Sequence, residues 1–128
     1  MANPWHHAVS SSRKWGGDPE DYLEIHEWFD ATKGWLPDSR HRAVRHHSEG
    51  VQQCVELFAP IRLSSGKVVP VRWVAEQHVT EDLGRIPIAA DWLRNMTPAP
   101  WMTRARQLSV EQEQEDQDEE AGRAAEAV

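Results

Sequence analysis

The chain has little cysteine and no long apolar run, and both absences narrow what it can be. Cys54 is the single cysteine in 128 residues, which excludes an internal disulfide and zinc modules built from several cysteines. No segment is apolar over the length that crosses a membrane, and the start MANPWHHAVSSS lacks the basic-then-apolar order of a secretory signal. We therefore expect a cytoplasmic protein with no membrane association.

Several catalytic motifs are also absent. The sequence has no glycine-rich phosphate loop, no HExxH pattern and no EF-hand calcium loop, so it gives no sign of a nucleotide-binding enzyme or of these metalloprotein families. Cys54 falls among apolar residues at helical spacing, which favours a core role over a nucleophile paired with histidine. No catalytic residue can be assigned from the sequence.

Acidic residues are concentrated near the end of the chain. The net charge is -7, from 14 basic and 21 acidic residues. Residues 103–128 hold eight acids and three arginines, a net of -5, which leaves -2 for residues 1–102. This end has no aromatic residue and contains the run EQEQEDQDEE, so we predict a single domain over 1–102 and a disordered acidic tail over 103–128. Nucleic-acid binding is not favoured, although the balance does not exclude a local basic patch.

Start and stop signals predict a mainly helical domain (α+β) with about five helices and one small β-hairpin. Seven tryptophans supply large apolar groups for its core. Asn3-Pro4 and Asp18-Pro19 are typical helix starts, and Gly16-Gly17 and Gly84 are typical stops. The predicted helices span about 5–14, 19–34, 38–58, 75–83 and 88–95, and the hairpin lies near 61–74 with Pro70 weakening its second strand.

Four ordered motifs carry a resemblance to a known family. They are HHAVSSSRKWGG, PEDYLEIHEWFD, DSRHRAVRHHSEG and AEQHVTEDLGRIPIAADWL, and the resemblance extends over about residues 5–102. On these motifs the chain resembles a small uncharacterised family, a domain of unknown function associated with bacterial and phage genomes. The resemblance implies no established activity, so it assigns no site residue.

Histidine and carboxylate pairs suggest a metal site. Residues three or four apart on a helix can ligate one ion, and the chain has His26 with Asp30, His78 with Asp82, and Asp38 with His41. Pairs of this kind also arise by chance in a chain with seven histidines. For His26, a structural hydrogen bond to Asp30 is the other interpretation.

The stretch DSRHRAVRHHSEG holds three more histidines. On a continuous helix, His47 shares the apolar face, where it is either a hydrogen-bonded core histidine or a metal ligand. His41 and His46 point elsewhere, and with the neighbouring arginines they are predicted to form a solvated polar face.

Two hypotheses follow. The leading one is a cytoplasmic protein with one divalent transition metal, zinc, iron or manganese, held by His26, His47, His78 and Asp82; any activity would first be sought as a metal-dependent hydrolase. The alternative is a non-enzymatic interaction protein that binds a protein partner or forms a homodimer, and whose histidines are structural. Its partner or nucleic-acid surface would be the basic face formed by Arg40, Arg42, Arg45 and His46.

Overall fold

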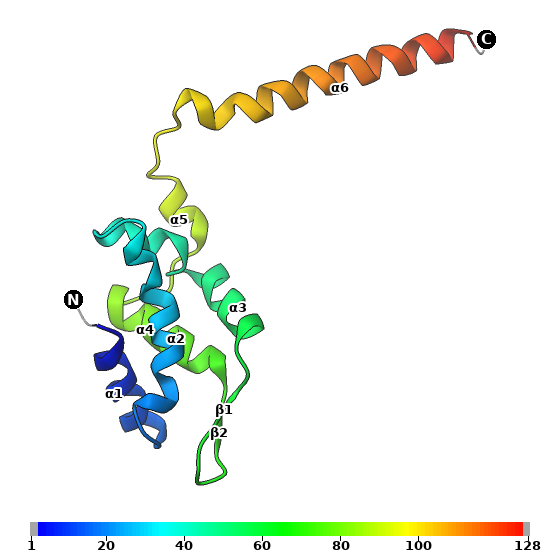
Figure 1. Cartoon of the computed structure of the whole chain (residues 1–128). Helices are drawn as coiled ribbons and strands as arrows, with labels where there is room; N and C mark the ends of the chain where they lie inside the picture. Colours follow the sequence, from blue (N-terminus) through cyan, green and yellow to red (C-terminus); the bar gives the residue numbers. More distant parts are fainter. Residues whose placement is uncertain (1–2, 127–128) are drawn as a thin grey trace. The chain divides into compact units, whose positions relative to one another are not determined.

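The structure, a computed structural model, describes the backbone of residues 3–126 and the side chains of that range other than 104–112 and 124–126. The chain divides into two compact units, residues 1–95 and 96–128. The described part holds six α-helices, two short 3-10 helices and one two-stranded sheet (Figure 1). The predicted mainly helical fold with a small hairpin is confirmed.

The first two helices form as their capping signals predict. Helix α1 (Pro4–Trp15) begins where the Asn3 side chain accepts a hydrogen bond from the His6 backbone, and it ends at Gly16, whose φ of 91° favours glycine. Helix α2 (Glu20–Asp30) starts after the second start signal, Asp18-Pro19. A short 3-10 helix, η1 (Ala31–Gly34), then extends it to the predicted end.

The long helix predicted over 38–58 is wrong. The segment forms a 3-10 helix, η2 (Ser39–Val44), then a turn, and then the helix α3 (Ser48–Leu57). The turn has its own local cause: His47 caps α3 by accepting a hydrogen bond from the Gly50 backbone, 2.9 Å away. A periodic apolar pattern continues across this break because both pieces are helical, so the pattern alone does not reveal it.

The hairpin is shorter than predicted. Strands β1 (Ile61–Arg62) and β2 (Val68–Val69) pair antiparallel, and the helix α4 (Val71–Leu83) begins directly after Pro70. Proline has no N–H for a strand ladder but is well suited to a helix start. The valines after Pro70, which suggested a longer strand, instead lie on α4.

Helix α4 is the centre of the first unit. It contacts α1, α2 and α3, and the short helix α5 (Ala89–Leu93) follows it. The apolar core lies among these helices and the hairpin, and it consists of Ala8, Tyr22, Ile25, Phe29, Val51, Cys54, Leu63, Val69, Val71, Val74, Ala75 and Val79. Most of these side chains are small, and polar side chains are buried beside them.

The second unit contains one long helix, α6 (Pro100–Glu126). The described backbone is helical as far as residue 126, and glutamate, glutamine, alanine and arginine have high helix propensity. The disordered tail expected from residue 103 stays a prediction. The side chains of 113–123 are exposed. Residues 127–128 lie outside the described range, and the predicted domain boundary after residue 102 stays a prediction.

We expect Gly50→Ala to lower the free energy of unfolding by about 2 kcal/mol or more, as overpacking does. A Cβ atom at Gly50 would lie 1.8 Å from the Arg45 carbonyl oxygen, so the turn before α3 could not stay in place. Gly34→Ala is the matched control, because a Cβ there meets nothing within 4 Å. Urea denaturation measures both. Equal stabilities of the two variants would contradict the close approach at Gly50.

Candidate metal centre

Helix α4 carries polar side chains into the interior of the first unit. His78 and Asp82 are four residues apart, so they lie one turn apart on the same face. Their side chains are 0% and 3% exposed. A buried carboxylate is costly unless hydrogen bonds and opposite charge surround it. Imidazoles from α1 and from the turn before α3 supply these contacts.

Two imidazoles and two carboxylates converge between α2, α4 and that turn. We call Asp30, His46, His78 and Asp82 the His/Asp cluster, and one ligand atom from each lies within 4.8 Å of the other three. His46 Nε2 lies 2.9 Å from Asp82 Oδ2 and 3.9 Å from Asp30 Oδ1. His78 Nε2 lies 3.3 Å from Asp82 Oδ2 and 3.4 Å from Asp30 Oδ1. These four donors can hold a metal ion.

The His/Asp cluster is buried and incompletely hydrogen-bonded. His78 Nε2, Asp30 Oδ2 and His46 Nδ1 are buried without a hydrogen-bond partner. Among the side chains that the structure describes, the only other such atoms belong to His41 and Arg42, in the neighbouring helix η2. Folded proteins rarely leave buried polar atoms unpaired, and such atoms point to a bound ion or water. Their concentration around one cluster marks it as the candidate site.

A second group, His7, His26 and His78, also brings its nitrogens within 4.8 Å of one another. Here the nitrogens already have partners. His26 Nδ1 lies 2.9 Å from His78 Nδ1, a hydrogen-bond distance. His7 contacts Glu81 at 2.9 Å through Nδ1 and Asp82 at 3.1 Å through Nε2. These contacts indicate that His7 and His26 support the His/Asp cluster and are not the ligands of a second ion.

The hydrogen bonds extend from His26 through α1 and back to α4. His26 Nε2 lies 2.8 Å from the Ser11 hydroxyl, and that hydroxyl donates to Gln77 Oε1 at 2.6 Å. Gln77 Nε2 in turn donates to the His7 carbonyl at 3.0 Å and to Glu81 at 2.7 Å. The polar network therefore links three helices through buried side chains.

The surroundings keep both aspartates of the cluster ionised. Burial acts to raise the pKa of Asp82, but hydrogen bonds with His46 and His7 hold it far below its usual range. Burial likewise acts to raise the pKa of Asp30, and the adjacent His78 imidazole more than offsets this. Carboxylates in this form are the ones that bind metal ions.

The histidines differ in charge. Burial, together with the nearby imidazoles of His78 and His7, lowers the pKa of His26 to about 2, so His26 is neutral. Burial also lowers the pKa of His46, against the effect of Asp82. For His7, burial acts to lower the pKa, but its hydrogen bonds to Asp82 and Glu81 raise it above the ordinary value. His7 therefore brings positive charge to the carboxylates.

The structure brings together three of the four predicted ligands. His78 and Asp82 belong to the His/Asp cluster, and His26 is hydrogen-bonded to His78 beside it. His47 lies elsewhere: its Nδ1 accepts from the Gly50 backbone and its Nε2 lies 3.1 Å from the Ala43 carbonyl. These contacts use both of its ring nitrogens to hold the turn.

The leading hypothesis from the sequence does not include Asp30 or His46 as ligands. Asp30 has a detectable signal, its four-residue spacing from His26, which predicts either a shared ion or a hydrogen bond between the two. In the structure the His26 nitrogens contact Ser11 and His78 instead. His46 has no such signal, because its position depends on the break between η2 and α3. Its carbonyl accepts a hydrogen bond from Trp92 Nε1 at 3.0 Å, which helps to hold the turn in place.

The solvated polar face predicted for His41 and His46 is wrong. Both side chains are buried, with 1% and 0% exposed. His41 Nδ1 lies 3.2 Å from the Thr32 hydroxyl, which connects η2 to η1. The prediction assumed a regular helix, and the 3-10 geometry followed by a turn points these side chains inward instead.

The structure does not bring the four residues of the alternative basic face together. Arg40 is exposed and paired with Asp38, at 2.7 Å. Arg45 lies over the Trp28 ring at 4.2 Å and donates to the Trp28 carbonyl. Arg42 is 13% exposed, with its guanidinium 3.8 Å from Asp82. With His46 inside the cluster and Arg42 and Arg45 partly buried, Arg40 is the one exposed residue of the four.

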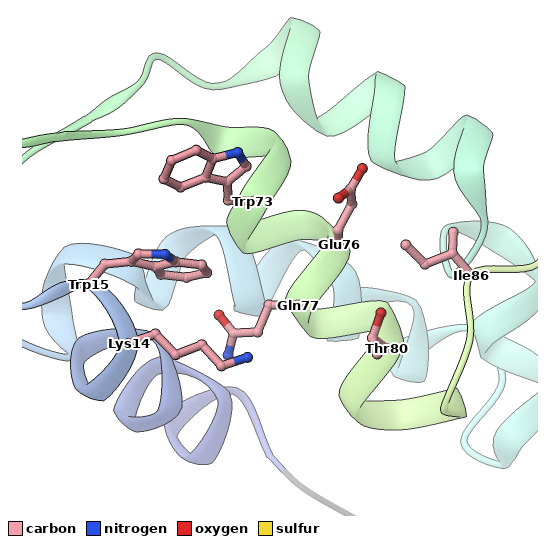
Figure 2. A pocket seen from close by; sticks show the side chains of 7 residues that line it. All are labelled: Lys14, Trp15, Trp73, Glu76, Gln77, Thr80 and Ile86. Atoms are coloured by element: carbon pink, nitrogen blue, oxygen red, sulfur yellow. The ribbon is translucent and has the colours of Figure 1, made fainter.

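Two surface pockets lie away from the His/Asp cluster, and none of its four residues lines either. Figure 2 shows one of them, a pocket of about 330 Å³ between α1 and α4; it is lined by Lys14, Trp15, Trp73, Glu76, Gln77, Thr80 and Ile86. Gln77 is where this pocket meets the buried polar network. Cys54 lies in the core as predicted, and burial raises its pKa to about 12.

One family model matches the chain over residues 2–102, and its description is a domain of unknown function (DUF6915). Neither the curated proteins nor the solved structures contain a match. The resemblance to a family without an assigned activity is thus confirmed. In the described part of the chain, no helix combines the length and the apolar character needed to cross a membrane.

We expect the metal-free protein to lose stability as the pH falls below about 6.5, the ordinary pKa of histidine. Folded His26, with its pKa near 2, excludes a proton that the unfolded chain binds, so its contribution falls by about 1.4 kcal/mol per pH unit. Asp82 adds to the loss only below about pH 4, where the unfolded carboxylate takes up its proton. The pKa of His7 is raised, so the stabilisation that its protonated ring contributes is lost as the pH rises.

Urea denaturation between pH 7 and pH 4.5 measures this effect. His26→Asn removes the excluded proton and should flatten the slope, whereas His6→Ala, at an exposed position on α1, should leave the slope as it is. A wild-type stability that stays constant over this range would contradict the buried neutral state of His26.

Proposed function

Since the chain belongs to this family of unknown function, we propose from the site alone that the domain binds one divalent transition-metal ion at the His/Asp cluster. The ion would cross-link α2, the turn before α3 and α4. One observation carries the proposal: His78 Nε2 is fully buried and unpaired, and it faces carboxylate oxygens of Asp30 and Asp82 at 3.4 and 3.3 Å.

The spacing of the donors supports a single ion. Ligands at about 2.0–2.1 Å around a tetrahedral metal are about 3.3 Å apart. The four measured separations in the cluster run from 2.9 to 3.9 Å, so small side-chain movements would complete such a sphere. Two carboxylates also neutralise a divalent charge, which favours a 2+ ion in a buried site.

The donor types narrow the choice of metal. Imidazole and carboxylate suit zinc, iron and manganese, and the absence of thiolate disfavours soft ions such as Cu(I). Four protein ligands without an obvious open position are typical of structural zinc. We therefore expect zinc first, and iron or manganese as the other outcomes of a metal analysis.

The burial of the donors supports a structural role. Every side chain of the cluster is at most 6% exposed, and neither surface pocket reaches it. An ion that activates water for a substrate needs an open coordination position. The metal-dependent hydrolase stays a prediction, and no contact in the cluster supports it.

A protein partner or homodimer also stays a prediction, and Trp35, 72% exposed, is a ring that such an interface would cover.

The first test is metal binding by tagless protein stripped with chelator and then titrated with zinc. We expect about one zinc per chain, as one four-ligand site requires. Asp30→Asn and His46→Ala should each weaken binding by about a hundred-fold or more, since even an outer contact to a ligand contributes ten- to a hundred-fold. Competition with a chromophoric chelator measures the Kd.

Matched controls remove the same side-chain types away from the cluster. Asp18→Asn and His6→Ala change exposed residues and should bind zinc as the wild type does. His47→Asn tests the remaining sequence-predicted ligand; it should keep zinc affinity, because His47 lies outside the cluster and asparagine can still cap α3 by accepting from the Gly50 backbone. The proposal is wrong if the wild type binds no transition metal, or if the cluster variants bind as tightly as these controls.

We also expect zinc to stabilise the fold. At a free zinc concentration a thousand times the Kd, the free energy of unfolding should rise by about 4 kcal/mol, because the ion binds the folded chain. Thermal melting with and without zinc measures the gain. Asp30→Asn should show little of it at the same zinc concentration. A metal that binds without raising the melting temperature would argue against a cross-linking role.

A further inference from the structure

Three buried polar side chains lie behind the His/Asp cluster without being ligands: Ser11 on α1, His26 on α2 and Gln77 on α4. Their exposed fractions are 0%, 0% and 5%. They form one line of hydrogen bonds that ends at His78 Nδ1, the nitrogen opposite the one that faces the cluster. Which atom is the donor in each of these hydrogen bonds follows from the groups around Gln77, at the end of the line away from His78.

The amide of Gln77 has one acceptable orientation. Its Nε2 lies 3.0 Å from the His7 carbonyl oxygen and 2.7 Å from the Glu81 carboxylate, and both of these groups can only accept. The opposite orientation would place the amide oxygen against two other oxygens. Gln77 Oε1 therefore faces the Ser11 hydroxyl as an acceptor.

Ser11 has a single hydroxyl proton to give. Its oxygen lies 2.6 Å from Gln77 Oε1 and 3.0 Å from the His7 carbonyl, so the proton goes to one of these two acceptors. The hydroxyl can meet His26 Nε2, at 2.8 Å, only as an acceptor. His26 consequently carries its proton on Nε2.

The same reasoning passes through the His26 ring to His78. A neutral imidazole with its proton on Nε2 has a lone pair on Nδ1. His26 is 0% exposed and its two ring nitrogens contact the Ser11 hydroxyl and His78 rather than a carboxylate, so the ring is neutral. His78 Nδ1, 2.9 Å away, must then be the donor of the hydrogen bond between the two rings.

We infer that Ser11 and His26 are positioning residues that fix His78 with a proton on Nδ1, so that its Nε2 is the nitrogen free to bind a cation. The proton on His78 Nδ1 follows from the hydrogen bonds and the neutral His26 ring, whereas its use in metal binding rests on the proposed function. In the neutral His78 ring, the Nε2 lone pair then faces two carboxylate oxygens at 3.3 and 3.4 Å, an arrangement that a cation between them would stabilise. Hydrogen-bonded partners behind metal-binding histidines fix the ring and its tautomer in this way.

Nuclear magnetic resonance on metal-free, ¹⁵N-histidine-labelled protein tests the inference directly. Long-range proton–nitrogen correlations at mildly alkaline pH distinguish the two tautomers of each ring. We expect the Nδ1-protonated form for His78 and the Nε2-protonated form for His26. The reverse pair of tautomers in the wild type would overturn the inference, whatever the protein's metal affinity proves to be.

A serine pair on α1 provides matched variants. Ser11→Ala leaves His26 Nε2 without its acceptor, so we expect mixed tautomers at both rings and a ten- to hundred-fold weaker Kd for zinc. Ser12→Ala removes a hydroxyl that donates to the Val9 carbonyl at 3.0 Å, and it should change neither. Ser11→Thr keeps the hydroxyl and should restore the wild-type tautomers.

The outcomes separate the inference from the proposed function. The expected tautomers in a protein that binds no metal would uphold the hydrogen-bond assignment and contradict the metal proposal. If the wild type binds zinc tightly, and Ser11→Ala changes neither the tautomers nor the zinc affinity, the metal proposal is upheld and the role of Ser11 and His26 is contradicted. If Ser11→Ala does not fold, the wild-type spectrum alone decides.

Discussion

The fold of the first unit depends on keeping the charge of Asp82 inside it. A buried carboxylate without partners costs several kcal/mol, so the chain must bring hydrogen bonds and positive charge to it. His46 reaches it at 2.9 Å from the turn before α3, and His7 reaches it at 3.1 Å from α1. One side chain on α4 thereby specifies where two other elements lie.

This polar centre shares the interior with a modest apolar core. Hydrogen bonds in such a network fix how the helices lie relative to one another, which small apolar side chains do only weakly. The network stabilises the fold only if nearly every polar atom in it has a partner. Most of its atoms do, and the exceptions include His78 Nε2, which faces Asp30 Oδ1 and Asp82 Oδ2. A cation there would give His78 Nε2 a partner and neutralise two carboxylates at once.

The sequence predicts the parts of this arrangement that are local. Capping at Asn3 and the spacing of His78 and Asp82 depend on neighbours within one helical turn, and the structure shows both. The break after η2 is not local in this sense. It depends on the close approach of Gly50 to the Arg45 carbonyl, which the spacing of apolar residues does not reveal. The prediction of one helix over 38–58 therefore places His46 on the wrong side of the chain, facing solvent.

Two adjacent histidines in that turn show how local structure and the site depend on each other. His47 holds the start of α3 through Gly50, and this leaves the preceding residue, His46, directed toward Asp82. The carbonyl of His46 is held in turn by Trp92, from α5. Because cap, turn and cluster share these consecutive residues, a change that made residues 45–50 regularly helical would move His46 away from Asp82. The irregular turn is therefore needed to form the candidate site.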